Sequence, residues 1–216
     1  ANGGTPNWGT NWGAGDVMYA NLDGKEGVNN GSNTLEDHGD LTIIGNNTPR
    51  YNFGLTLTGA WKGFDFSVFL QGVMKRDYWL DGPYFWGANG GLWQSTAFKE
   101  HMDYWRPEGD PLGANTNAYY PKPYFNTDKN QKVQSGYLQN AAYCRLKNAQ
   151  IGYTLPKTWT RKAAMESVRV YVSGDNLVTF SGISGVFDPE LLGSDWGDGK
   201  LYPLQRTISI GLNVNF

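Results

Sequence analysis

The 216-residue chain has 18 basic and 20 acidic side chains and a net charge of −2, which excludes a nucleic-acid-binding protein with a basic surface. No run approaches the roughly 18 apolar residues of a membrane-spanning helix, which excludes a helical membrane protein. The aromatic content of 15% and a mean hydropathy of −0.52 remain compatible with a membrane β-barrel, because its strands alternate apolar and polar residues. The chain opens without a basic and apolar leader, so we expect it to follow processing or to lie within a longer polypeptide.

Residues 51 to 73 predict a β-hairpin. Its first half alternates between apolar residues and a face of Asn, Gly and Thr, and its second half repeats that period of two. The two halves meet at Lys62-Gly63, a two-residue turn. The apolar positions are Tyr51, Phe53, Leu55, Leu57, Trp61, Phe64, Phe66, Val68 and Leu70.

Residues 74 to 140 form a long connection that is rich in aromatic residues. A loop of this length needs a function or its own packing, and exposed rings suit the faces of sugars or peptide contacts. An alternative is that the rings only build a small core for the loop. The residues that we expect to bind a ligand are Trp79, Tyr84, Trp86, Trp93 and Trp105.

Residues 141 to 180 predict a second hairpin, and residues 204 to 216 predict a terminal strand. In the first strand the alternation changes phase, which indicates a β-bulge near Leu146 to Asn148. A turn of helix is expected between Thr160 and Glu166. The terminal strand alternates up to Phe216, with Arg206 as the exception near its start, where a cation can reach the membrane interface.

The connections alternate between short and long, as they do in bacterial outer-membrane barrels. Residues 62 to 63 and 156 to 167 are short and predict turns on the periplasmic side. Residues 1 to 50, 74 to 140 and 181 to 203 are then external loops, and the last strand runs inward. Each strand is about ten residues long, which is enough to cross a bilayer when tilted. The sequence therefore predicts an all-β chain of about five antiparallel strands from a larger transmembrane barrel.

Several segments resemble the SusC/RagA-type TonB-dependent transporters of Bacteroidetes. They occur in the family's order and cover most of the chain outside residues 74 to 140. The matching segments are Pro49-Arg50-Tyr51-Asn52-Phe53-Gly54, Trp61-Lys62-Gly63-Phe64-Asp65-Phe66-Ser67-Val68-Phe69-Leu70-Gln71-Gly72, Arg145-Leu146-Lys147-Asn148, Ile151-Gly152-Tyr153-Thr154-Leu155-Pro156, Val170-Tyr171-Val172-Ser173-Gly174-Asp175-Asn176-Leu177, Phe187-Asp188-Pro189-Glu190 and Tyr202-Pro203-Leu204-Gln205-Arg206-Thr207.

The resemblance implies that residues 1 to 216 are the C-terminal part of a barrel of about 22 strands with an N-terminal plug. It implies import of nutrients across the bacterial outer membrane, with a SusD-like surface lipoprotein over the barrel and TonB acting through the missing N-terminal part. Phe216 resembles the terminal aromatic signal that the barrel-assembly machinery reads. Glycans are the first expected cargo, and oligopeptides are the alternative.

We expect no cofactor and no metal. In the family, an acidic turn before the first strand here has the composition of a calcium loop. This chain has Asn21-Leu22-Asp23-Gly24-Lys25 there, and the ammonium group of Lys25 opposes Ca²⁺ among its oxygen ligands. We therefore expect no calcium in this external loop.

Two other functions are weighed against import. A soluble carbohydrate-binding β-module would need charged outer strand faces, whereas these faces carry Phe, Val, Leu and Ile. A glycosidase would need paired carboxylates, and Asp188 with Glu190, or Glu108 with Asp110, are the nearest candidates. Pro and Gly neighbours indicate that both pairs lie in turns, and His38 and His101 lack partners at a catalytic spacing. We therefore expect that the chain is not an enzyme.

The expected ligand residues give a mutational prediction. We expect the double substitution Trp86→Ala with Trp93→Ala to weaken cargo binding without preventing assembly.

Overall fold

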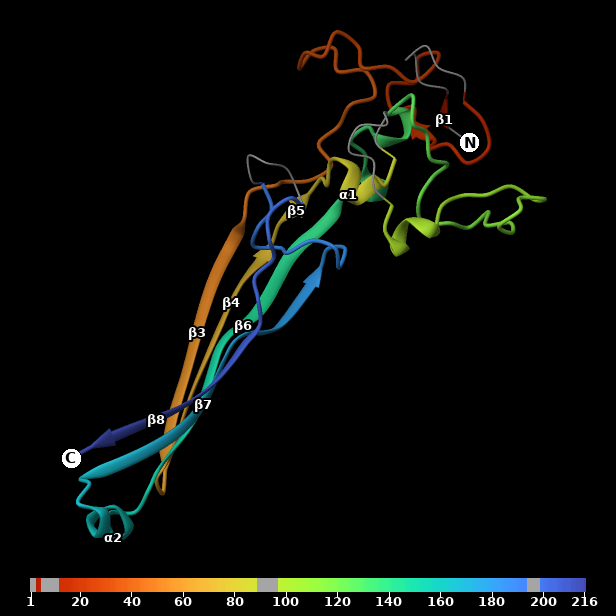
Figure 1. Cartoon of the computed structure of the whole chain (residues 1–216). Coiled ribbons are helices and arrows are strands. Elements are labelled where there is room, and N and C mark those ends of the chain that lie inside the picture. Colours follow the sequence, from red (N-terminus) through yellow and green to blue (C-terminus); the bar gives the residue numbers. More distant parts are fainter. Residues whose placement is uncertain (1–2, 5–11, 89–96, 194–198) are drawn as a thin grey trace. The chain divides into compact units, whose positions relative to one another are not determined.

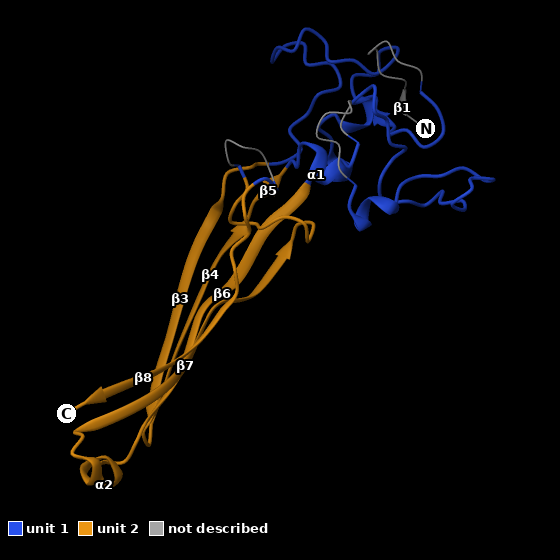
Figure 2. Ribbon diagram, viewed as in Figure 1, with its two compact units in different colours: residues 1–45, 79–138, 193–200 blue, residues 46–78, 139–192, 201–216 orange. Residues whose placement is uncertain are grey.

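The computed structural model describes residues 3–4, 12–88, 97–193 and 199–216 (Figure 1). The chain divides into two compact units (Figure 2). We call residues 46–78, 139–192 and 201–216 the strand unit, and residues 1–45, 79–138 and 193–200 the loop unit.

The strand unit is an antiparallel sheet with the strand order β3-β4-β6-β7-β8, and the short strand β5 pairs with β6 beyond the end of β4 (Figure 1). The antiparallel all-β prediction is therefore confirmed. The strands are β3 (Arg50–Trp61), β4 (Phe64–Lys75), β5 (Asp77–Tyr78), β6 (Gln139–Thr154), β7 (Ser167–Gly182) and β8 (Thr207–Asn215). The last strand begins later than the expected residue 204, because the Leu204 N–H donates to the Asp188 carboxylate instead of to a strand.

Strand register gives the sheet one apolar and one polar face. One row of paired residues across the apolar face is Trp61, Phe64, Tyr153, Val170 and Leu212. The next row on the same face is Gly59, Phe66, Ile151, Val172 and Ile210. Between them on the opposite, polar face lies the row Ala60, Asp65, Gly152, Tyr171 and Gly211. Side chains on the apolar face are largely exposed, so this face has no cover within the described chain.

The predicted bulge lies in β6. Leu146 and Asn148 pair with consecutive residues of β4, Leu70 and Phe69, so Lys147 is the extra residue. The register between β6 and β7 shifts at the same place. The extra residue reverses the alternation, so Leu146 remains on the apolar face and Arg145 moves to the polar face. The bulge thus keeps a buried arginine off the face that carries Phe, Val and Ile.

The short connections are compact. Lys62 and Gly63 both have positive φ, 48° and 89°, as a two-residue hairpin turn requires. The connection between β6 and β7 contains α2 (Lys157–Thr160) followed by a 3₁₀ turn, η4 (Arg161–Ala163), so its helical turn begins earlier than the expected Thr160. None of the helices among the described residues has the length and apolar character needed to cross a membrane.

The loop unit has little regular structure. Its elements are β1 (Gly3–Gly4), β2 (Tyr19–Ala20), α1 (Pro83–Trp86), and the 3₁₀ turns η1 (Lys99–Met102), η2 (Lys129–Gln131) and η3 (Ser135–Tyr137). Segments from residues 1–45 and 79–138 pack together in this unit, although the sequence predicted two separate loops. A buried ion pair joins them, since Lys129 Nζ lies 2.8 Å from Asp16 Oδ2.

Candidate functional site

A cluster of aromatic side chains forms the centre of the loop unit. Phe85 and Trp86 belong to α1, which begins at Pro83, a residue preorganised for a first helical turn. The Trp86 ring makes edge contacts with Tyr120 and Tyr137, at centroid distances of 6.5 and 5.0 Å. Burial raises the pKa of Tyr137 to about 12 and also raises the pKa of Tyr120, so both hydroxyls stay protonated at physiological pH.

The described residues that were predicted to bind ligand have different surroundings. Trp86 is only 6% exposed, and Trp79 lies 5.8 Å from it between ring centroids. Tyr84 stacks on Phe98 at 5.7 Å. Trp105 packs directly on Gly15, whose positive φ and missing side chain leave room for the indole ring. Trp93 lies outside the described residues.

The buried position of Trp86 changes the expected effect of the Trp86→Ala substitution. Trp86 also contacts Phe85 at 5.1 Å between ring centroids, so Trp86→Ala removes packing on several sides. Truncation of a buried Trp costs about 3–5 kcal/mol. The Trp86→Ala variant therefore tests the folding of the loop unit before it tests cargo binding.

A cavity of about 310 Å³ lies beside the cluster. The side-chain amides in its wall are already bonded: the Asn130 amide donates to Asp16 and to the Lys122 carbonyl, and the Gln131 amide donates to the Ala88 carbonyl. His101 Nδ1 accepts from the Phe98 N–H, so His101 Nε2 carries the proton that it donates to the Phe85 carbonyl. The cavity therefore offers mainly ring faces and aliphatic carbon. Its apolar and aromatic wall residues are Trp86, Ala88, Ala97, Met102, Tyr104, Tyr120, Pro121, Pro123, Tyr124 and Phe125.

The Lys129–Asp16 pair holds two segments of the loop unit together. The Lys129 ammonium lies over the rings of Trp12 and Tyr124, at 5.0 and 4.3 Å from their centroids. Burial by itself raises the pKa of Asp16, but hydrogen bonds from Lys129 and Asn130 outweigh it and hold the pKa below its usual value. For Lys129, burial lowers the pKa, and the hydrogen bond to Asp16 raises it above its usual value. Sequence reasoning missed this pair, because no periodicity connects residues so far apart.

A second polar cluster lies on the polar face of the sheet. Arg145 Nη2 lies 2.7 Å from Asp188 Oδ1, and Arg145 Nη1 lies 2.9 Å from Glu190 Oε1. Lys147 Nζ lies 3.1 Å from Glu190 Oε2, and Arg145 Nε donates to Thr179 Oγ1 at 2.7 Å. The bulge therefore brings two cations of β6 to two carboxylates of the connection between β7 and β8.

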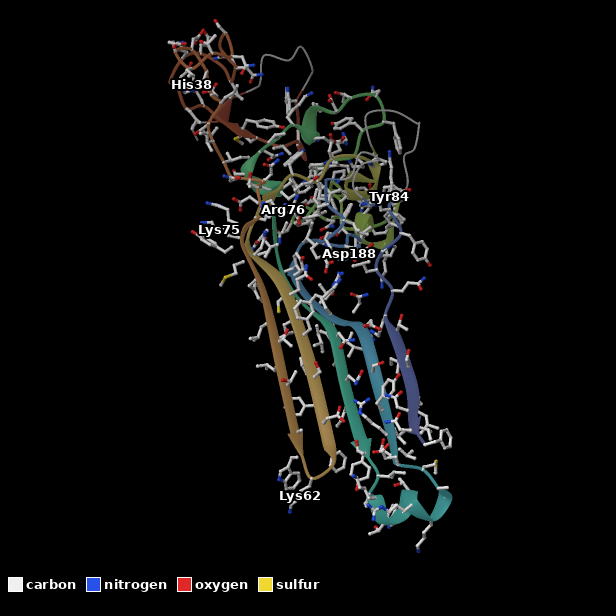
Figure 3. All side chains as sticks on the ribbon, turned by 90° about the vertical axis from the view of Figure 1, so that its left-hand side faces the viewer. His38, Lys62, Lys75, Arg76, Tyr84 and Asp188 are labelled. Carbon is white, nitrogen blue, oxygen red and sulfur yellow. The ribbon has the colours of Figure 1, made fainter. Side chains whose placement is uncertain are left out.

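This cluster unites motifs that are separate in the sequence. Asp188 also accepts from the backbone N–H groups of Glu190 and Leu204, at 3.0 and 3.3 Å. Asn148 donates to Asp175 at 2.8 Å on the neighbouring strand. Figure 3 shows Asp188 above the sheet at the end opposite Lys62. The two carboxylates weighed as a catalytic pair are thus engaged with Arg145 and Lys147.

The acidic segment that was considered as a calcium site contains the ammonium group of Lys25 among its carboxylate oxygens. Lys25 Nζ lies 3.5 Å from Asp23 Oδ2 and 3.7 Å from Asp37 Oδ1. Asp40 accepts three backbone N–H groups, from Leu22, Asp23 and Asn29. Across the part of the chain that the structure describes, no three His, Cys, Asp or Glu side chains gather as metal ligands.

Together, long antiparallel strands with one apolar face, compact turns at one end and aromatic-rich loops define a portion of a β-barrel of the outer-membrane type. No protein-family model matches the chain. It is 30% identical over 215 residues to TonB-dependent receptor P3 of Formosa agariphila, covering 94% of this chain and 19% of that protein. It is 26% identical over 193 residues to TonB-dependent receptor SusC of Bacteroides thetaiotaomicron, covering 87% of this chain and 17% of that protein.

Solved structures agree with these relatives. The RagAB peptide transporter superposes with a TM-score of 0.59 at 25% identity, covering 81% of this chain and 18% of that chain. The chain is therefore homologous to the TonB-dependent receptors, including SusC and RagAB, over most of its length, which confirms the resemblance found in its motifs. It spans about a fifth of the length of the relatives that it matches.

Proposed function

We propose that this chain is the C-terminal part of an outer-membrane importer of nutrients that depends on TonB. The observation that carries the proposal is the two-faced sheet: an uncovered apolar face of Phe, Val, Ile and Leu lies opposite a face of Ser, Thr, Asn and Gln. An apolar outer surface with a polar interior is the arrangement of membrane barrels. Homology to TonB-dependent receptors supports the same function.

The proposed mechanism is binding and energised release, without covalent chemistry. The remainder of the barrel and its plug would complete the pore, a SusD-like lipoprotein would cover its external mouth, and TonB would displace the plug. The cluster around Arg145 supports a passive wall at this part of the polar face, since cations hold both carboxylates and two backbone N–H groups also donate to Asp188.

The cargo has two candidates. Trp-rich loops favour a glycan, which remains the first expectation from the sequence. The likeness to the RagAB peptide transporter supports an oligopeptide as the second. The cavity in the loop unit favours the second, because a sugar needs partners for a hydroxyl on nearly every carbon and the amides in this wall are already bonded.

Uptake by intact cells tests the proposal. Molecules that copurify with the full-length receptor would be identified by mass spectrometry and supplied in labelled form. We expect their uptake to cease when the receptor is deleted and when the proton gradient that drives TonB is collapsed. Uptake that is unchanged by both treatments would refute energised import.

A further inference from the structure

Three cations at the turn between β6 and β7 have no acidic partner in the part of the chain that the structure describes. Lys157, Arg161 and Lys162 are all exposed, and none forms an ion pair with another described residue. By contrast, three cations on the polar face of the sheet are paired: Arg145 and Lys147 with the carboxylates described above, and Arg169 with Asp65. Glu166 is the acidic side chain of the same turn and is also exposed, so the turn keeps a net positive charge.

The same turn exposes a large aromatic ring. Trp159 is 63% exposed, although Thr160 beside it is buried. The nearest row of the apolar face contains Trp61, Phe64 and Tyr153, and the last two rings pack at 4.5 Å between centroids. Trp and Tyr are enriched where a membrane meets water, because one part of the ring is apolar and another is polar. An exposed Trp at the same end of the sheet as this row therefore indicates the level of the lipid headgroups.

The turn holds these side chains on a folded backbone. The Ala164 N–H donates to the Arg161 carbonyl at 3.2 Å, and the Met165 N–H donates to the Thr160 carbonyl at 3.1 Å. The Glu166 N–H donates to the Asn215 carbonyl at 2.8 Å, which ties the turn to β8. The cations consequently project from a defined end of the sheet, the end marked by α2 in Figure 1 and by Lys62 of the neighbouring turn in Figure 3.

We propose that this turn binds an anionic phospholipid, with Lys157, Arg161 and Lys162 around the headgroup phosphate and Trp159 beside the glycerol region. Charge favours this partner, because each basic side chain near an anionic membrane surface strengthens binding and a zwitterionic lipid lacks the net charge. Arg can bind a phosphate through two N–H groups at once. The inference rests on the proposed membrane location and adds a lipid-binding site to it.

Native mass spectrometry of the full-length receptor tests the site, with phosphatidylglycerol and phosphatidylcholine added to detergent micelles as probes. Arg161→Gln with Lys162→Gln should weaken retention of phosphatidylglycerol about 30-fold and leave phosphatidylcholine unchanged. The control is Lys99→Gln with Lys122→Gln, which removes the same charge from exposed positions in the loop unit.

Added inorganic phosphate should not displace the lipid, because the apolar contacts of Trp159 are absent for a free ion. The proposal is overturned if both double variants lose phosphatidylglycerol equally, if phosphate displaces it fully, or if the wild-type receptor does not prefer it over phosphatidylcholine. A receptor that is integral to the membrane but shows no such preference would refute this inference alone. A receptor that is not in the membrane would refute the proposed function.

Discussion

The side chain of Arg145 forms ion pairs with two carboxylates of the connection between β7 and β8. Its guanidinium is 4% exposed and lies between Asp188 and Glu190, so the ion pairs form away from water. A buried ion pair is expensive to break, because removal of one partner leaves the other charge without compensation. Arg145 therefore fixes the connection between β7 and β8 onto the polar face.

Replacement of Arg145 by Leu should lower the stability of the receptor by about 3–5 kcal/mol, because the buried Asp188 loses its cation and Glu190 keeps only Lys147. Thermal unfolding in detergent would measure the change. Lys75→Gln is the matched control, since Lys75 is an exposed cation that forms no ion pair with other described residues, at the end of the hairpin opposite Lys62 (Figure 3). Equal stability of the two variants would contradict the role given to Arg145.

The lowered pKa of Asp16 predicts that the folded loop unit loses stability at acid pH. Because folding lowers its pKa, its contribution is complete above the ordinary aspartate pKa of about 3.9 and is lost as pH falls through the lower value of the folded state. Limited proteolysis between pH 7 and pH 3 should show cleavage near residues 12–16 only below about pH 4. Asp16→Asn should allow that cleavage at pH 7, and resistance of this variant would count against the pair.

Phe125 is the most direct residue for testing cargo contact. It lines the cavity and is 53% exposed, so its loss should not unfold the aromatic cluster. Phe125→Ala should weaken binding of the copurifying cargo about 3- to 10-fold, the value of one aromatic contact, in calorimetric titrations. Leu35→Ala removes an exposed apolar side chain of the loop unit away from the cavity and should bind normally. Unchanged affinity of the Phe125 variant would exclude the cavity as a cargo site.

At the scale of the element, the strands were predictable because the alternation of apolar and polar residues can be read from neighbouring positions in the sequence. Even the bulge at Lys147 was visible, since the phase of the apolar residues changes between Leu146 and Ala149. The start of β8 was not predictable, because the Leu204 N–H is taken by Asp188. The pairs Arg145–Asp188 and Lys129–Asp16 were also invisible, since they depend on where distant loops fold.

The two faces of β7 predict opposite effects for the same substitution. Val172→Arg places a cation on the apolar face and should cost about 2–4 kcal/mol if that face meets the middle of a bilayer. Ser173→Arg places it on the polar face and should be tolerated. Unfolding in urea with lipid vesicles present would compare the variants. Similar losses for both would show that the faces do not differ in environment.

At the scale of the whole molecule, residues 1–45 and 79–138 form one unit instead of two separate loops. The expected small aromatic core exists around Phe85 and Trp86, and the cavity lies beside it. Whether the predicted ligand residues bind cargo stays a prediction, and Phe125 joins them. Sequence could indicate the density of rings but not which of them packs inward.

We expect the apolar face of the sheet to meet lipid in the assembled barrel. Outer membranes from cells that contain the full-length receptor would be washed with alkaline carbonate and then extracted with detergent. We expect the receptor to stay in the washed membranes and to dissolve only with detergent, because residues such as Ile210 and Val172 then leave lipid for a micelle. Release of the folded receptor by the carbonate wash alone would contradict the account.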